Sequence, residues 1–450
     1  MEPRDGSSIL PTLTIFDPIV QWSRTSDFQS DNIGSNPIGV IFYERGFIMR
    51  VIPPLCQKDP HHVDHRKLPI KTWSPELDDK TFKQAQNLAN LPFTFKHIAL
   101  MPDTHMGYGM PIGGVLATKG YVVPNAVGVD IGCGMAAVRL PLKEVDRDAL
   151  KYIMNMIRKT VPMGFKKHYK GRPENKMPKG EQSDYLLDHG IVSKEMNNAK
   201  KSLGTLGGGN HFIEIQMGSD GHVWAMVHSG SRNLGLKVAD YYNKIAVSEN
   251  EKFHSCVPKS HELAYLPIES EHGRNYLEEM NYCVEFARLN RKEMMSCVVG
   301  AIYTILDLRE DHDEIIDVAH NYARMENHYG ENVMVHRKGA TSAKAGETGI
   351  IPGSQGSMSY IVKGKGNTKS FKSCSHGAGR KMGRKEAQRK LDLSDEIENL
   401  DDKGIIHSIR TVKDLDEATG AYKDIEEVMD NQGDLVFPIV QLRPLAVLKG

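Results

Sequence analysis

Residues 97–120, HIALMPDTHMGYGMPIGGVLATKG, hold two short apolar runs on either side of a glycine-rich turn. Short apolar runs bounded by Gly and Pro are typical of β-strands, so HIALMPD and PIGGVLATKG are predicted to be strands. The preceding segment, SPELDDKTFKQAQNLANL, is predicted to be a helix with Ser74 as its cap and Pro75 in its first turn.

Further along the chain, the same reading gives more strands and one long helix. MAAVRLPL at 135–142, HVWAMVHSGSR at 222–232 and the glycine-rich stretch 345–367 are predicted to contain strands. From Tyr276 to Leu308, apolar residues recur at helical spacing, which predicts the longest helix of the chain. Because this order is mixed and not a regular βαβ alternation, the expected fold class is α+β.

Composition restricts the classes of function. The 450 residues carry a formal net charge of zero, so any nucleic-acid site must be a local basic patch. The six cysteines form no CxxC pair, which suits a reducing compartment, and we expect a cytoplasmic protein. No run of about 18 apolar residues is present, so we expect no membrane span.

The first 48 residues differ from the rest, because they mix Ser, Asp, Asn and Pro without a sustained period. We interpret residues 1–48 as an N-terminal extension that is partly disordered, and residues 49–450 as one large domain.

Five short segments place metal-type ligands among small residues. Imidazoles together with a thiolate and a carboxylate suit a divalent ion such as Zn²⁺, Mn²⁺, Fe²⁺ or Co²⁺. Taken singly, each histidine is more often a hydrogen-bonded core residue, but three glycines around the Asp130–Cys133 pair argue against a core role for that thiol. The candidate side chains are Asp103, His105, Asp130, Cys133, Asn210, His211, Glu214, His228 and His320.

A denser cluster of the same residue types, CQKDPHHVDH at residues 56–65, is interpreted differently. It lies in a proline-bearing segment ahead of the first helix, with little to hold it rigid, and catalytic ligands need rigid support. We therefore expect a solvated loop there.

Three basic, glycine-rich segments have the composition of phosphate-binding loops: HRKGA at 336–340, IPGSQGS at 351–357 and HGAGRKMGR at 376–384. Backbone N–H groups freed by Gly and the forked guanidinium of Arg are suitable phosphate ligands. None of the three matches a GxxxxGK[ST] loop. The third contains His376, which has no apolar sequence neighbour and is expected to be exposed.

Ten motifs in this order resemble the RtcB family of RNA ligases, over roughly Met49 to Gly450. They are MPDTHMGYGMPIGGVLAT, AVGVDIGCGM, GGGNHFIE, HSGSRNLG, AHNYARMENH, HRKGATSA, IPGSQGSMSY, SCSHGAGR, AYKDIEEVM and LRPLAVLKG. Their wording is more similar to bacterial-type members than to archaeal and eukaryotic ones. The resemblance implies a single α+β domain around a dinuclear metal site.

The resemblance also implies the chemistry. A GTP- and Mn²⁺-dependent ligase joins an RNA 3′-phosphate or 2′,3′-cyclic phosphate to a 5′-hydroxyl, through a guanylylated histidine and an RNA 3′-guanylate. His376 corresponds to that catalytic histidine, and Asp103 is our candidate for orienting its ring. The implied metal ligands, with the thiolate bridging two ions, are Asp130, Cys133, His211, His228 and His320.

Motif by motif, the resemblance also implies a guanylate pocket. Its members are Asn210, His211, Phe212, Ile213, Glu214, His320, Asn321, Pro352, Gly353, Ser354, Gln355, Ser359, His376, Gly377, Ala378, Gly379, Tyr422 and Lys449. Two positions depart from the family pattern: Gln355 stands where Met is frequent, and Gly383 where Ser is common.

Arg232, Lys338 and Arg380 follow closely after these motif histidines, and we expect them to bind RNA phosphates and not to read bases. The alternative is that each pairs with a nearby carboxylate. The expected partners are RNA and GTP, with an archease-like activating protein suggested by the family, and we expect a monomer.

Two other functions stay open at the level of sequence. A dinuclear metal phosphatase or nuclease would use the same cluster but would need neither His376 nor Lys449. A family member that binds or caps RNA ends without sealing them would keep every motif.

Overall fold

The computed structural model describes residues 39–43, 47–54, 68–179, 182–309 and 311–450. Most of the predicted N-terminal extension and the cluster at residues 56–65 lie outside these ranges. The predicted boundary at Met49 falls inside a strand, β2 (Phe47–Ile52), which pairs with β1 (Gly39–Tyr43). Residues from 39 onward belong to one compact unit.

Within the described residues, the first large sheet has seven strands in the order β1-β2-β3-β4-β5-β13-β12. Its neighbours pair antiparallel except for β3 and β4, which run parallel. The strands not yet bounded are β3 (Ile70–Thr72), β4 (Thr94–His105), β5 (Ile112–Thr118), β12 (Asn321–His328) and β13 (Glu331–Lys338).

The second large sheet of the described part also has seven strands, in the order β11-β7-β9-β8-β18-β16-β15, all antiparallel. Its strands are β7 (Gly134–Arg139), β8 (Phe212–Gly218), β9 (Val223–Ser229), β11 (Ile316–Ala319), β15 (Thr348–Ile351), β16 (Ser359–Gly364) and β18 (Val436–Lys449). Two short pairs complete the strands: β6 (Tyr121–Val122) with β10 (Leu266–Pro267), and β14 (Ala340–Ser342) with β17 (Ser373–Ser375).

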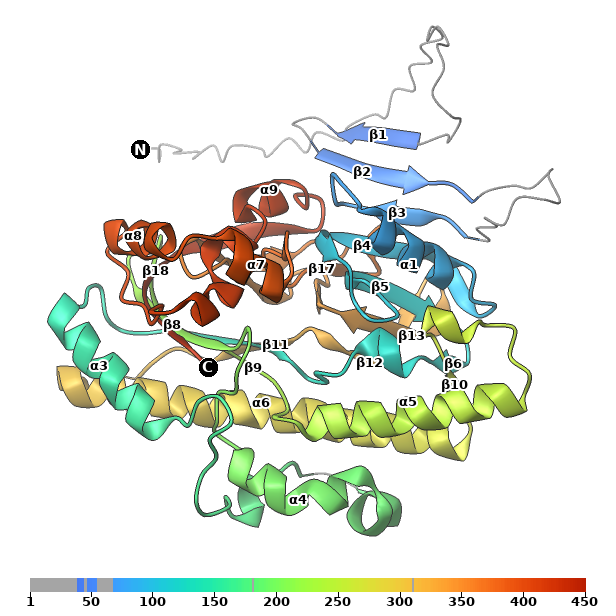
Figure 1. Ribbon diagram of the computed structural model, residues 1–450, viewed down its shortest axis with the longest axis horizontal. Helices are drawn as coiled ribbons and strands as arrows, with labels where there is room; N and C mark the ends of the chain where they lie inside the picture. The colour runs from blue at the N-terminus through green and yellow to red at the C-terminus, as the bar shows by residue number, and fades with distance from the viewer. Residues whose placement is uncertain (1–38, 44–46, 55–67, 180–181, 310) are drawn as a thin grey trace, which may run out of the picture. The chain divides into compact units, whose positions relative to one another are not determined.

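Helices collect on one face of the second sheet. The 36-residue α6 (Glu271–Leu306) runs along it, with α3 (Arg147–Thr160) and α5 (Leu234–Lys252) packed beside it (Figure 1). The other α-helices are α1 (Asp79–Ala89), α2 (Pro124–Val127), α4 (Ile191–Ser202), α7 (Arg384–Lys390), α8 (Leu393–Asp402) and α9 (Ile425–Asp430). The predicted α+β class, strands and long helix are confirmed.

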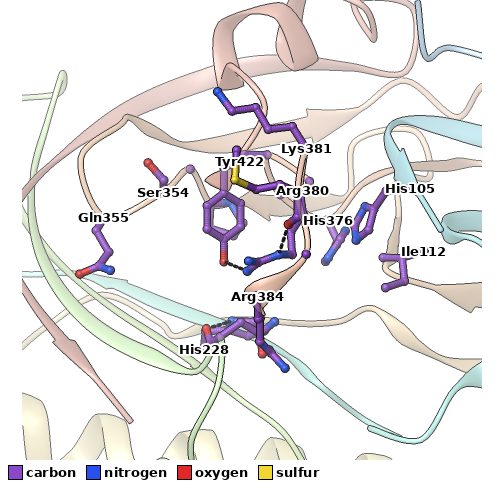
Figure 2. A pocket seen from close by; sticks show the side chains of 18 of the residues that line it. His105, Ile112, His228, Ser354, Gln355, His376, Arg380, Lys381, Arg384 and Tyr422 are labelled. Atoms are coloured by element: carbon purple, nitrogen blue, oxygen red, sulfur yellow. Dashed lines mark hydrogen bonds between the residues drawn. The ribbon is translucent and has the colours of Figure 1, made fainter. Parts of the chain in front are cut away.

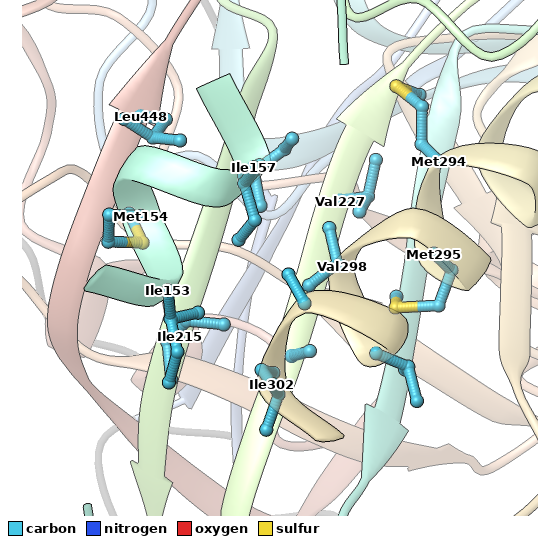
Figure 3. Close-up of a cluster of buried hydrophobic side chains, with 14 of the residues drawn as sticks. Ile153, Met154, Ile157, Ile215, Val227, Met294, Met295, Val298, Ile302 and Leu448 are labelled. Carbon is cyan, nitrogen blue, oxygen red and sulfur yellow. The ribbon is translucent and has the colours of Figure 1, made fainter. Parts of the chain in front are cut away.

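The alternation of side chains along the second sheet separates its core from its functional face. Ile215 of β8, Val227 of β9 and Leu448 of β18 point toward α3 and α6, where they form a buried cluster with Val298 (Figure 3). Ile213 of β8 belongs to the same cluster. Since successive residues of a strand face opposite sides, their neighbours in the chain point away from the helices.

Those neighbours are chemically different from the core residues. Phe212 lies opposite His228 in the register of β8 and β9, and Lys449 of β18 lies opposite Phe212. Glu214, two residues along β8, faces the same side. One face of the sheet is therefore a hydrophobic core, and the other presents Phe, Glu, His and Lys side by side.

The predicted cap of the first helix is wrong. Helix α1 begins at Asp79, and its cap is Asp78, whose Oδ1 accepts hydrogen bonds from the backbone N–H groups of Lys80 and Thr81. The Ser74 hydroxyl instead donates to the carbonyl of Glu76. Ser and Asp are both favoured caps, and the carboxylate lies at the actual helix start. None of the described helices has the length and apolar character that crossing a membrane requires.

Candidate active site

Five side chains from distant parts of the chain meet at one end of the second sheet. Cys133 precedes β7, His211 precedes β8, His228 lies in β9, and His320 follows β11. Cys133, His228 and His320 place their ligand atoms within 4.8 Å of one another, and so do Asp130, Cys133 and His211. Cys133 is the member that both groups share.

Two of the imidazoles are oriented by backbone carbonyls. His211 Nδ1 lies 2.9 Å from the carbonyl oxygen of Leu206, and His228 Nδ1 lies 3.0 Å from that of Asn210. A carbonyl only accepts, so each Nδ1 donates to it and each Nε2 is turned toward the cluster. The two Nε2 atoms lie 3.5 and 3.3 Å from Cys133 Sγ, as ligands around a common metal site would.

The third imidazole has an unsatisfied atom. His320 is 3% exposed, and its buried Nδ1 has no hydrogen-bond partner in the described structure. An orphaned polar atom of this kind is rare in a protein interior. His320 also places one ring nitrogen within 4.8 Å of the Cys133 and His228 ligand atoms, so the donor set fits a metal site.

The electrostatics of the cluster agree with ligand roles. Burial would raise the pKa of Asp130, but the hydrogen bond to His211 and its charge outweigh burial and hold that pKa at about 2. Burial, and then the neighbouring imidazoles, lower the pKa values of His228 and His320 well below the ordinary range, so both rings are neutral. Burial and the Asp130 charge raise the pKa of the Cys133 thiol, which a bound cation would deprotonate.

Helix α6 supports the loops that carry this cluster. The fully buried Arg291 donates from Nη1 to the carbonyls of Gly132 and Ser229, and its other nitrogens bind Asp317 at 2.6 and 2.8 Å. Gly132 has φ +78°, and an added Cβ would lie 2.9 Å from the backbone of α6 at Cys283. Only glycine permits that approach, which brings Cys133 against the helix.

His376 follows β17 and lies beside the cluster. Its Nδ1 is 2.6 Å from Asp103 Oδ2, and its ring centroid is 4.9 Å from that of His320. The side chain is only 16% exposed, so the expectation of an exposed imidazole is wrong. The residues that enclose it come from other segments: Asp103 of β4, His320, and Gly339, whose added Cβ would lie 3.0 Å from the ring.

A cavity of about 580 Å³ opens on one side of His376. Figure 2 shows Tyr422 and Arg380 lying together inside it, with Ser354 and Gln355 on one side and His105 beside His376. Most of the predicted guanylate pocket lines this cavity: Asn210, Phe212, Glu214, Pro352, Gly353, Ser354, Gln355, His376, Gly377, Ala378, Gly379, Tyr422 and Lys449.

A second cavity, of about 960 Å³, opens on the other side. It is lined by four of the metal-type ligands, Asp130, Cys133, His211 and His320, together with Arg232 and Lys338. Three residues predicted for the guanylate pocket line this cavity and not the first: His211, His320 and Asn321. Four residues line both cavities: Ile112, Asn210, His376 and Arg384. The candidate nucleophile therefore lies on the boundary between the two.

Two predicted pocket residues line neither cavity. Ile213 is buried in the core against the helices, as strand alternation requires. The buried Ser359 hydroxyl accepts from the backbone N–H of Gly353 at 3.1 Å and from Gln216 at 3.2 Å. Ser359 thus supports the loop that carries Gly353.

The three cations predicted to bind RNA phosphates differ in their surroundings. Among the described residues, Arg232 pairs with no carboxylate; it donates to the Thr205 hydroxyl and the Gly164 carbonyl. Lys338 donates to two backbone carbonyls, and burial lowers its pKa to about 8. Arg380 instead pairs with Glu417 at 3.0 Å, as in the alternative interpretation.

Several functional candidates have no signal in the sequence motifs. Glu417 is 2% exposed and binds Arg380, Arg384 and the Tyr422 hydroxyl. Arg337, which belongs to a predicted phosphate loop, is fully buried and pairs with Glu326. Arg380 and Arg384 lie 37 and 33 positions from Glu417, so spacing alone does not reveal these two pairs. Arg384 belongs to the phosphate loop predicted at residues 376–384.

The family model described as tRNA-splicing ligase RtcB matches residues 84–450. The chain belongs to the RtcB family. It is 41% identical to the RNA-splicing ligase RtcB of Escherichia coli K12, over 85% of this chain and 97% of that protein. It is 32% identical to the tRNA-splicing ligase RtcB of Thermococcus kodakarensis, over 83% of this chain and 91% of that protein.

A eukaryotic relative, the RNA-splicing ligase RtcB homolog 1 of Entamoeba dispar, is 33% identical over 82% of this chain and 81% of its own length. The predicted membership in the RtcB family is therefore confirmed. The higher identity to the bacterial protein agrees with the bacterial-type wording of the motifs.

Proposed function

We propose that this protein is an RNA ligase that uses GTP and Mn²⁺ to join an RNA 3′-phosphate or 2′,3′-cyclic phosphate to a 5′-hydroxyl. The observation that supports this most directly is the position of His376 on the boundary between the two cavities. A nucleophile there can receive a nucleotidyl group from one cavity and pass it to a group in the other. Membership in a family whose model is named for a ligase supports the same reaction.

His376 would act through Nε2, because its Nδ1 is held by Asp103. The carboxylate accepts the Nδ1 proton and leaves the Nε2 lone pair free. Attack of Nε2 on the α-phosphorus of GTP forms an N–P bond and releases pyrophosphate. An oxygen of the RNA 3′-phosphate then displaces the histidine, and the 5′-hydroxyl finally displaces GMP.

The metal ligands proposed are Asp130, Cys133, His211, His228 and His320. When bound, Mn²⁺ would neutralise phosphate charge and orient the leaving group. Because Cys133 belongs to both ligand groups, its thiolate would be the ligand common to the ions that the two groups would hold.

The first cavity has complementary hydrogen-bonding groups for a guanine nucleotide. Glu214 and Lys449 come from adjacent strands, and the Lys449 ammonium lies 5.3 Å from the Phe212 ring centroid. A carboxyl oxygen accepts N–H groups of a base, and an ammonium donates to carbonyl or phosphate oxygens. The glycine at 379, with φ +73°, packs so closely on Asp103 that an added Cβ would lie 2.3 Å from its carbonyl. This packing holds the His376 loop against β4.

Arg232 and Lys338 would bind phosphate oxygens in the second cavity, since their contacts are to uncharged groups. Arg380 would still bind the charged phosphate of the guanylate. Because it also pairs with Glu417 and donates to the Tyr422 hydroxyl, removing Arg380 would also change the position of Tyr422. An archease-like activator and a monomeric state stay predictions.

The direct test is incubation with α-labelled GTP and Mn²⁺, followed by RNA with 3′-phosphate and 5′-hydroxyl ends. We expect labelled protein, then labelled RNA, then sealed RNA. His376→Ala should lose all three, and His272→Ala, on the exposed start of α6, should keep them. Transfer without sealing would instead identify an end-capping protein. Phosphate release without labelled protein would identify a phosphatase or nuclease.

A further inference from the structure

Two large aromatic side chains are exposed on the segment between α3 and α4. Figure 1 shows the path of this segment between the two helices. This loop, Pro162–Arg172, has the sequence PMGFKKHYKGR. Phe165 is fully exposed and Tyr169 is 92% exposed. Leaving apolar rings in water forgoes the stabilisation that burial would give them, so such exposure in a folded chain favours a binding role.

The loop is not a loose tail, because backbone hydrogen bonds anchor it at both ends. The N–H of Gly164 donates to the carbonyl of Gly207 at 2.8 Å. Farther along, the N–H groups of His168 and Arg172 donate to the carbonyls of Lys201 and Lys200 at 2.9 and 2.8 Å. The two exposed rings are thus presented from a fixed backbone.

The loop is continuous with the second cavity. Gly164, Phe165 and Lys167 line that cavity together with Cys133 and His376. Arg232 ties the loop to the site, since its Nη2 donates to the Gly164 carbonyl at 3.3 Å. Phe165 therefore lies on the wall of the same cavity as His376.

The charge of the loop is of one sign. Its eleven residues include Lys166, Lys167, Lys170 and Arg172, and no Asp or Glu. Lys200, beside its end, is paired with Glu174, so not every cation there is free. Exposed rings interleaved with lysines on an anchored backbone suit single-stranded nucleic acid, whose bases stack on rings while its phosphates bind cations.

We propose that Phe165 and Tyr169 form a stacking platform for the terminal bases of a single-stranded RNA end whose terminus enters the second cavity. This inference rests on the proposed function and adds to it how the RNA end is held. The platform recognises the π-face of a base and not its identity, so it would serve RNA of any sequence. The 3′-phosphate strand and the 5′-hydroxyl strand share this chemistry, and separate measurements distinguish them.

The test measures binding without GTP, so it does not depend on ligase activity. Single strands of about 10 nucleotides, with 2-aminopurine as the terminal base and either a 3′-phosphate or a 5′-hydroxyl end, are titrated with protein. Phe165→Ala and Tyr169→Ala should each weaken binding by about 5- to 150-fold for at least one strand. Phe165→Tyr keeps an aromatic ring at this position and should bind as wild type does. Phe253→Ala should not change binding, because Phe253 is an exposed residue just after α5 and lines neither cavity.

An abasic terminal nucleotide makes the experiment specific for stacking. Wild type should bind the abasic strand as weakly as Phe165→Ala binds the intact strand. Phe165→Ala should bind the intact and the abasic strand with equal affinity. Equal losses on intact and abasic strands, or unchanged binding of both strands, would overturn the proposal and leave a protein partner as the remaining occupant. The strand whose binding falls identifies the end that the loop holds.

The failure of the proposed function gives a different result. Labelling of the wild-type protein by α-labelled GTP tests the ligase mechanism separately, because the guanylate cavity includes neither Phe165 nor Tyr169. Absence of labelling in wild type would contradict the ligase mechanism, whereas the binding titration would still decide the stacking platform.

Discussion

The imidazole of His376 and the carboxylate of Asp103 are joined twice. Asp103 Oδ2 lies 2.6 Å from Nδ1 of the ring and also accepts the backbone N–H of His376 at 3.1 Å. The carboxylate is fully buried, so it fixes both the loop and the ring. Asp103→Asn removes the charge and one of these acceptors, and we expect guanylylation to slow by about 100-fold, the cost of a misplaced reactive group.

The measurements should separate a positioning role from a loss of folding. Affinity for GTP and the number of Mn²⁺ ions bound, measured by calorimetry, should match wild type while the labelling rate falls. Asp434→Asn is the control, because Asp434 binds Trp73 at 2.8 Å outside both cavities. Labelling of Asp103→Asn at the wild-type rate would show that His376 reacts without a carboxylate at its Nδ1.

The shared position of Cys133 gives the second prediction. A thiolate between two cations reduces their mutual repulsion, so Cys133→Ala should bind fewer than the two Mn²⁺ ions expected for wild type and should form no His376 adduct. Cys297→Ala, at a half-buried cysteine of α6 outside the cluster, should retain both properties. Two ions per chain in Cys133→Ala, measured by calorimetry, would exclude the bridge.

The ion pair between Arg291 and Asp317 gives the third prediction. Removing one partner of a buried ion pair leaves an uncompensated charge and typically destabilises by about 3–5 kcal/mol. Arg291→Met should lose that much in urea unfolding and should also weaken Mn²⁺ binding, because Arg291 holds the carbonyls of Gly132 and Ser229.

Arg288 provides the matched control, one turn earlier on α6. It makes a similar bidentate pair with Glu285, but both side chains are exposed. Exposed pairs contribute about 0–1 kcal/mol, so Arg288→Met should change little. Equal stability losses in the two variants would show that burial of the Arg291 pair has no special weight.

The sequence was sufficient to predict those parts of the fold and the site whose signal is local or is carried by a whole motif. The GGGNHFIE motif named Phe212 and Glu214, which line the first cavity, but it also named Ile213, which the alternation of β8 turns into the core. The sequence was insufficient where partners are distant. Arg380 meets Glu417 across 37 positions and Arg291 meets Asp317 across 26, and only the fold brings such pairs together.

The last prediction concerns Glu214, which is 3% exposed on the wall of the first cavity. Burial raises the pKa of its carboxyl from about 4.5 to about 8, although the Lys449 charge and the Gln216 hydrogen bond act in the opposite direction. Between these two pH values the folded chain holds a proton that the unfolded chain has released. Stability therefore falls as pH rises through this window, by at most about 1.4 kcal/mol per pH unit.

Glu214→Gln removes this titration, because an amide holds no proton to release in this range. The difference in unfolding free energy between the variant and wild type should therefore increase from pH 5 to about pH 8 and then level off. Urea unfolding at several pH values measures it, and Glu427→Gln, at an exposed carboxyl of α9, should follow the wild-type profile. A constant difference between Glu214→Gln and wild type across the window would mean that Glu214 is already ionised at pH 5. Its charge would then be balanced by Lys449 on the neighbouring strand throughout this range.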